Sequence, residues 1–265
     1  MSWALFKHNM KNSRFVWLLI TLTFIFYIVV IMTMYDPKNS EALSKMFELF
    51  PKDLMKAFGF TNIGTTLISF LATFYGSLEF LFPLIISIII NHRLICSYVD
   101  KRSMAYLLST PNSRLKIILT QAAFSIISIT ALFVASTIII ILSAEILHPG
   151  QLAIGKFILL NLYSLITYYA IGGIGFFASV IANDSKTSLS IGVGVPVGFF
   201  IIRMLANILT NTPWIKYFTL YSLFDMDKFV ESSSFIYIAM IILLIIGAFL
   251  YYLAIRIFTK KDLYI

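Results

Sequence analysis

Residues 117–143 read IILTQAAFSIISITALFVASTIIIILS, a run of 27 residues without a charged side chain. A helix needs about 20 apolar residues to cross the roughly 30 Å hydrocarbon core of a bilayer, so this run is long enough to span a membrane. Five further stretches have comparable length and hydrophobicity, and the full set is 15–34, 65–90, 117–143, 157–182, 189–209 and 235–257. The pattern predicts an all-α integral membrane protein with six transmembrane helices, in one transmembrane domain over residues 1–265.

The amino-acid composition excludes a soluble globular enzyme. Hydrophobic residues make up 60% of the chain and charged residues 12%, whereas soluble domains carry about 25% charged residues. The chain has one cysteine, Cys96, and its three histidines lie far apart in the sequence. We therefore expect neither an internal disulfide nor a metal site.

Sequence motifs of enzyme chemistry are absent as well. The chain contains no G-x-x-x-x-G-K-[ST] phosphate loop, no H-E-x-x-H and no G-x-S-x-G, which are signatures of ATP hydrolysis, zinc proteolysis and serine hydrolysis. Within the segment Gly172–Gly175, the glycines lie inside an apolar span, where they favour close helix packing rather than nucleotide binding. The sequence thus predicts a protein that is not an enzyme and binds no cofactor directly.

The distribution of basic residues predicts the orientation in the membrane. The N-terminus, the second and fourth connections and the C-terminal end hold 12 of the 20 lysines and arginines, and the other three connections hold 7. Basic residues concentrate on the cytoplasmic side, so both termini are expected there. The net charge of +8 then comes from this uneven distribution across the membrane. Attraction of the basic residues to anionic lipid headgroups is enough to explain it, and no nucleic-acid partner is required.

The segment 1–14 is too polar to cross the membrane. Trp3, Phe6 and Met10 recur at helical spacing, and Lys7 and Lys11 occupy another face. This pattern predicts an interfacial elbow helix before the first span. The alternative is a basic topology signal in which the aromatic residues are incidental.

The second connection, with its densest part at about 98–112, carries a short amphipathic segment. Asp100 or Ser103 can cap a helix, and Pro111 can end it. The apolar face would consist of Met104, Leu107 and Leu108. The segment is predicted either to dock onto a cytoplasmic partner or to pack against lipid headgroups.

Two charged residues, Glu79 and Arg203, fall inside predicted spans. Charged side chains in a bilayer face protein or water and often mark a transport path. Their predicted depths differ by about 12 Å along the helices, which disfavours a direct ion pair. For Glu79 the structural alternative is a carboxyl that is protonated or hydrogen-bonded between helices, and for Arg203 it is a side chain that extends outward to the interface.

The fifth predicted span contains Gly194 and Gly198, with Pro196 between them. Small residues at four-residue spacing let helices approach closely, and proline loosens the backbone hydrogen-bond ladder. The pattern predicts a helix packing seam. The seam can lie at a dimer interface or within one subunit, and the sequence does not distinguish these alternatives.

Two segments connect the chain with a known family. The stretch YLLSTPNSR at 106–114 resembles the "LLSTPvSR" stretch of ABC-2-type ABC transporter permeases, at the same place between the second and third spans. The ending FTKKDL at 258–263 is similar to that family's closing motif. Within the family, the resemblance is closest to permeases of bacterial peptide exporters, such as the staphylococcal exporters of phenol-soluble modulins.

The resemblance implies a multi-pass protein of a bacterial cell membrane that exports amphipathic or antimicrobial-type peptides. It implies two permease copies, identical or paralogous, with ATP and Mg²⁺ bound on separate ATPase subunits. The segment after the second span would be the coupling helix, with contacts by Asp100, Arg102, Met104, Tyr106, Leu107, Leu108 and Pro111. The family commonly has an acidic pair followed by Gly-Thr here, whereas this chain reads DKRSM at 100–104.

The sequence is also compatible with a different class of protein. An ATP-independent membrane carrier, or an immunity protein that sequesters a peptide, would also be apolar and helical. Carriers often show inverted repeats and several intramembrane ionisable groups. This chain has two such groups and no obvious repeat, which favours the permease.

Overall fold

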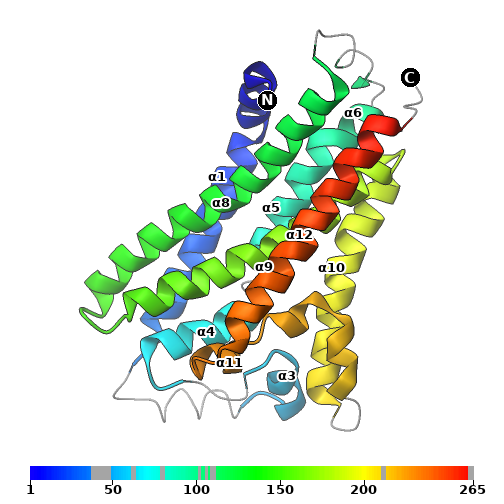
Figure 1. Ribbon diagram of the computed structural model, residues 1–265. Helices are drawn as coiled ribbons and strands as arrows, with labels where there is room; N and C mark the ends of the chain where they lie inside the picture. The colour runs from blue at the N-terminus through cyan, green and yellow to red at the C-terminus, as the bar shows by residue number, and fades with distance from the viewer. Residues whose placement is uncertain are drawn as a thin grey trace.

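A computed structural model describes residues 1–36, 49–60, 64–77, 81–100, 103, 104, 107, 112–209 and 213–261. Within these residues all regular structure is helical and no strand occurs. Helices run side by side along a bundle that carries both termini at one end, and short helices gather at the other end (Figure 1). We refer to these as the terminal end and the opposite end.

Within the described part of the chain, six helical segments are long and apolar enough to cross a membrane. They are α1 (Trp3–Thr33), the segment Leu81–Asp100, α8 (Arg114–Leu147), α9 (Ile154–Ile181), α10 (Ser185–Ile208) and α12 (Phe235–Lys260). The predicted all-α integral membrane protein with six transmembrane helices is confirmed. The assignment of the terminal end to the cytoplasm stays a prediction.

The second membrane-spanning segment differs from its predicted range of 65–90. The short helix α4 (Leu67–Ser77) covers the first part of that range, and residues 78–80 lie outside the described residues. A continuous segment then runs through α5 (Leu81–Asn91), the π-helix η1 (His92–Cys96) and α6 (Ser97–Asp100). The helix continues past Asn91, which was expected to begin a loop, because other helices satisfy its polar side chain.

The side chain of Asn91 is the centre of a buried polar network. Its amide donates to the carbonyl of Gly172 at 3.0 Å, and its oxygen accepts from the hydroxyl of Ser125 at 2.6 Å. The Ser125 hydroxyl also lies 2.8 Å from that of Tyr251. Polar side chains that bond across helices inside a membrane hold those helices together, so this network links α5, α8, α9 and α12.

The predicted elbow helix is not a separate element. Residues 3–14 form the first turns of α1, which continues without interruption to Thr33. The backbone amide of Ser2 donates to Thr120, and the amide of Asn9 donates to Gln121, at 2.7 and 2.5 Å. These two contacts hold the segment against α8, and its location in the membrane interface stays a prediction.

Helix α9 is the most buried spanning helix, and its longest contact is with α12. A Cβ atom added at Gly247 of α12 would lie 3.1 Å from the backbone carbonyl of Tyr169 in α9. One added at Gly173 would lie 3.1 Å from the Cβ of Leu250. The expectation that the glycines near residue 173 allow close helix packing is confirmed.

The short helices lie at the opposite end of the bundle (Figure 1). Two of them, α3 (Lys52–Ala57) and α4, precede the second span, and three lie between α10 and α12. The latter are η2 (Pro213–Phe218), η3 (Leu220–Leu223) and α11 (Met226–Val230).

Candidate functional site

At the terminal end, Asp100 connects the predicted coupling segment to α10. Its carboxylate accepts a hydrogen bond from the hydroxyl of Ser185 at 2.7 Å and a longer one from the Ser185 backbone amide at 3.4 Å. Ser185 is the first residue of α10. A carboxylate at a helix N-terminus also interacts favourably with the helix dipole. The end of the second span and the start of the fifth are therefore directly bonded.

Asp184 caps the same helix. Its carboxylate accepts from the backbone amide and from the hydroxyl of Thr187, both at 2.8 Å. These hydrogen bonds, the backbone bond first, lower the pKa of Asp184 below its usual value. Two carboxylates, from Asp100 and Asp184, thus meet at the N-terminus of α10.

The structure describes three of the seven predicted coupling residues. Met104 is buried and Leu107 is half-buried, and both pack against the core of the bundle. These two apolar side chains therefore contact the helix bundle itself. The other four predicted residues lie outside the described residues, and they are Arg102, Tyr106, Leu108 and Pro111.

Lys261 is a site residue that the sequence analysis missed. Its ammonium donates to the backbone carbonyls of Val180, Ile181 and Ala182 at 3.0, 2.9 and 3.1 Å. These carbonyls end α9, where a cation is favourable because the last carbonyls of a helix have no partner within it. Partial burial lowers the pKa of Lys261. A lysine directly after the last apolar helix was the available signal, and only the tertiary fold brings it to α9.

Arg114, at the start of α8, is bonded to the backbone of Lys261. Its guanidinium donates to the Lys261 backbone carbonyl at 3.0 Å. The connection between α9 and α10 is consequently held from two sides, by Lys261 on the α9 end and by Asp100 on the α10 end.

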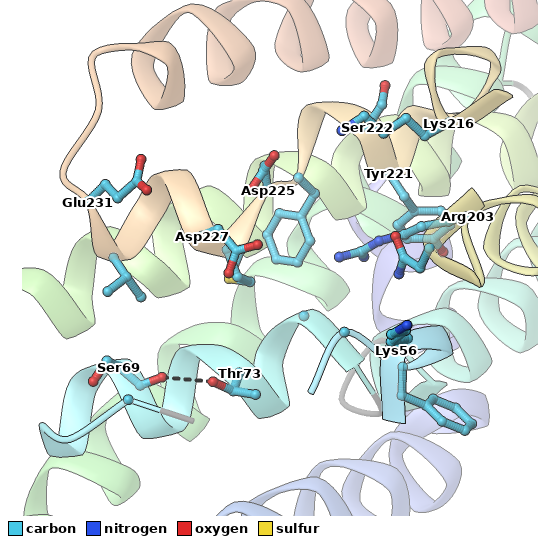
Figure 2. A pocket seen from close by; sticks show the side chains of 18 residues that line it. Lys56, Ser69, Thr73, Arg203, Lys216, Tyr221, Ser222, Asp225, Asp227 and Glu231 are labelled. Atoms are coloured by element: carbon cyan, nitrogen blue, oxygen red, sulfur yellow. Dashed lines mark hydrogen bonds between the residues drawn. The ribbon is translucent and has the colours of Figure 1, made fainter. Parts of the chain in front are cut away.

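At the opposite end, Arg203 lies in a polar cavity of about 360 Å³. Figure 2 shows side chains from α3, α4, α10 and the three short helices before α12 turned toward one another around this space. The charged residues that line it are Lys56, Arg203, Lys216, Asp225, Asp227 and Glu231. Of these six residues, the sequence analysis singled out only Arg203.

The guanidinium of Arg203 lies beside Gly76 of α4, a glycine whose missing Cβ leaves room for Met226. A Cβ atom at Gly76 of α4 would lie 3.7 Å from one Arg203 nitrogen and 2.7 Å from the side chain of Met226. The side chain of Arg203 lines the cavity. Among the described residues, it forms no hydrogen bond or ion pair. Glu79, the other predicted intramembrane charge, lies outside the described residues.

One carboxyl in the cavity is perturbed. Burial raises the pKa of Asp227, and the neighbouring carboxylates of Asp225 and Glu231 raise it further. Arg203 and Lys216 act in the other direction. Asp227 is therefore a group whose charged form would gain from an additional cation.

The predicted packing residues of α10 separate into two kinds. Pro196 is buried, whereas a Cβ atom at Gly194 or Gly198 would meet nothing within 4 Å. A different glycine, Gly192, makes the close contact within the subunit, because its Cβ would lie 3.6 Å from the Cα of Gly175. The Gly194 face of α10 is thus open in the single subunit, and α10 is also the least buried spanning helix.

In a comparison with known protein families, one family model matches almost the whole chain. Residues 3–263 match the model of a family described as "ABC-2 family transporter protein". No curated protein and no solved structure matches the chain.

Proposed function

The chain belongs to the ABC-2 family of transporter proteins, and from this premise we propose that it exports amphipathic peptides across a bacterial cell membrane as a homodimer. Membership makes it the transmembrane permease subunit of an ABC transporter, with ATP hydrolysis supplied by a partner ATPase. ATP and Mg²⁺ would be held by that partner, and this chain would bind neither directly. The substrate class comes from the resemblance to peptide exporters.

The observation that carries the proposed mechanism is the bond between Asp100 and Ser185. The ATPase would push on the coupling segment, to which Asp100 belongs. Because Asp100 is bonded to the first residue of α10, this displacement would pull directly on that helix. Movement of α10 would then change the contact between the two permease copies and open a path outward.

The open face of α10 supports the dimer interface. Among the described residues, Gly194 and Gly198 have no neighbours that would use their small size. A second copy of α10 could approach closely there, as small residues allow in membranes. Packing within one subunit, the other alternative, would need neighbouring atoms that the described residues do not provide.

The coupling step predicts a specific effect of Asp100→Asn. The substitution removes the negative charge that the Ser185 groups and the α10 N-terminus stabilise, worth about 0.5–1 kcal/mol at this exposed position. We expect the purified complex to keep ATP hydrolysis while ATP-driven uptake of a dye-labelled amphipathic helical peptide into inside-out proteoliposomes falls about fivefold or more.

The control for this prediction is a double-mutant cycle. Ser185→Ala removes the same side-chain bond from the other partner, so the double variant should be no worse than either single one. Fully additive losses, or unchanged uptake by Asp100→Asn, would contradict the proposed route. If the wild-type chain does not co-purify with an ATPase, the ATP-independent carrier or sequestering protein becomes the better description.

The dimer interface predicts that Gly194→Phe weakens self-association. A bulky side chain would project from the open face, where it disturbs no neighbour within the subunit. We expect at least a tenfold weaker dimer by light scattering in detergent, with an unchanged thermal unfolding midpoint of the monomer. Gly155→Phe is the matched control, because Gly155 also has no neighbour within 4 Å but lies on α9. A wild-type level of dimer in Gly194→Phe would exclude this interface.

A further inference from the structure

The charged side chains of the opposite-end cavity are sorted onto two walls. Figure 2 shows Arg203 and Lys216 on one side, with Lys56 below Arg203, and Asp227 and Glu231 toward the other side. Asp225 lies between them on the same connection as Asp227. The cavity therefore has a basic wall and an acidic wall, with three formal charges of each sign.

Among the described residues, the two walls form no direct ion pair with each other. Among the residues that the structure describes, the side chains of Lys56, Arg203, Lys216, Asp227 and Glu231 make no hydrogen bond or ion pair. Asp225 accepts only from the backbone amide of Lys228, as the cap of α11. Charged groups that are partly buried are stabilised by partners of opposite charge. The cavity thus offers separated positive and negative sites to a ligand that carries both charges.

Aromatic residues beside the cavity indicate its depth in the membrane. Trp214, Tyr217 and Phe218 are all strongly exposed on η2, and exposed Trp and Tyr mark the level of the lipid headgroups. Lys216 lies on the same short helix and lines the cavity. The cavity is therefore at headgroup level and beside the lipid.

We propose that this cavity binds the headgroup of a phospholipid with a primary amine, such as phosphatidylethanolamine, from the leaflet at the opposite end. The phosphate would lie against the basic wall, where the Arg203 guanidinium can form paired hydrogen bonds to phosphate oxygens. The ammonium would lie against Asp227 and Glu231, which accept hydrogen bonds from its N–H groups. A volume of about 360 Å³ fits a headgroup rather than a folded peptide.

The acidic wall selects between lipid classes. An anionic headgroup without an amine, such as that of phosphatidylglycerol, would satisfy the basic wall but would bring no additional cation to the acidic wall. The raised pKa of Asp227 supports this point, because a neighbouring ammonium would favour its ionised form. This inference goes beyond the proposed export function, since lipid binding requires neither the ATPase nor a transported peptide.

The test measures lipid binding to the full-length chain in detergent by native mass spectrometry. Titration with phosphatidylethanolamine and with phosphatidylglycerol of identical acyl chains should show one site that prefers the former at least tenfold. Arg203→Gln should weaken phosphatidylethanolamine binding at least tenfold. The matched control is Lys156→Gln, which removes an exposed lysine that bonds to Ser232 outside this cavity, and it should bind as the wild type does.

Further variants distinguish the walls and the source of the headgroup. Asp227→Asn should reduce the preference for phosphatidylethanolamine over phosphatidylglycerol to less than threefold. Lys216→Gln provides a second test of the basic wall if Arg203→Gln lowers the yield of folded protein. Equal binding of both lipids by the wild type, or wild-type affinity in both basic-wall variants, would overturn the proposal. So would free phosphoethanolamine that competes as strongly as the lipid, because the ligand would then be a soluble molecule.

Discussion

Gly247→Val should lower the free energy of unfolding by about 3 kcal/mol, at the upper end of the usual cost of overpacking. The Cβ atom alone would lie 3.1 Å from both the carbonyl carbon and oxygen of Tyr169 and 3.2 Å from the amide nitrogen of Ala170. These are backbone atoms of α9 and cannot rotate away as a side chain would. The valine methyl groups would force α12 and α9 apart along their longest contact.

The measurement is thermal or denaturant unfolding of the full-length chain in detergent. Gly155→Val is the control, because a Cβ at Gly155 meets nothing within 4 Å. It should cost at most a few tenths of a kcal/mol, since valine is not a poorer helix former than glycine. Equal losses in the two variants would show that the α9–α12 contact is not the cause.

Lys261→Met should also destabilise the protein, by about 2 kcal/mol. The methionine keeps the length of the side chain but removes the three hydrogen bonds to the carbonyls at the end of α9. Partly buried carbonyls then lose their partners, which costs about 1–3 kcal/mol, and the favourable cation at the helix C-terminus is lost as well. Incomplete burial of Lys261 lets water replace part of the interaction, which sets the expected loss in the middle of that range.

The adjacent lysine provides the control for this prediction. Lys260 is exposed at the end of α12, and Lys260→Met should change the unfolding midpoint little. The Lys261→Met variant should also show faster amide hydrogen exchange in the last turn of α9 than the wild type. Unchanged exchange there, together with unchanged stability, would mean that the three bonds do not hold this helix end.

The sequence was sufficient for the number and type of spanning helices because hydrophobicity over 20 residues is a local property. It was not sufficient to predict where the second spanning helix begins and ends. Asn91 and Arg93 were expected to lie in a loop, yet Asn91 is bonded to α8 and α9 inside the bundle, and Arg93 donates to a carbonyl of α1 at its surface. Such partners are distant in the sequence, and hydropathy contains no information about them.

The candidate site was predictable to a similar degree. Arg203 stood out because a charge within an apolar run is unusual. Asp227 and Glu231 lie in a polar connection, where charged residues are ordinary, and only the fold brings them to the cavity around Arg203. Likewise, the fifth span offers several glycines, and their spacing does not reveal that Gly192 contacts α9 whereas Gly194 does not.

The bonded N-terminus of α10 has a mechanical consequence. Ser185 and Arg203 lie on one helix, about 27 Å apart at 1.5 Å per residue, and little of this helix is buried against the rest of the subunit. Helix α10 is therefore long enough to carry a displacement of its N-terminus, where Asp100 is bonded, to the cavity around Arg203. A tilt of about 5° about Ser185 would shift Arg203 by about 2 Å over that length. That distance is comparable to a hydrogen bond, so a small pull at one membrane face would be enough to rearrange the charges at the other.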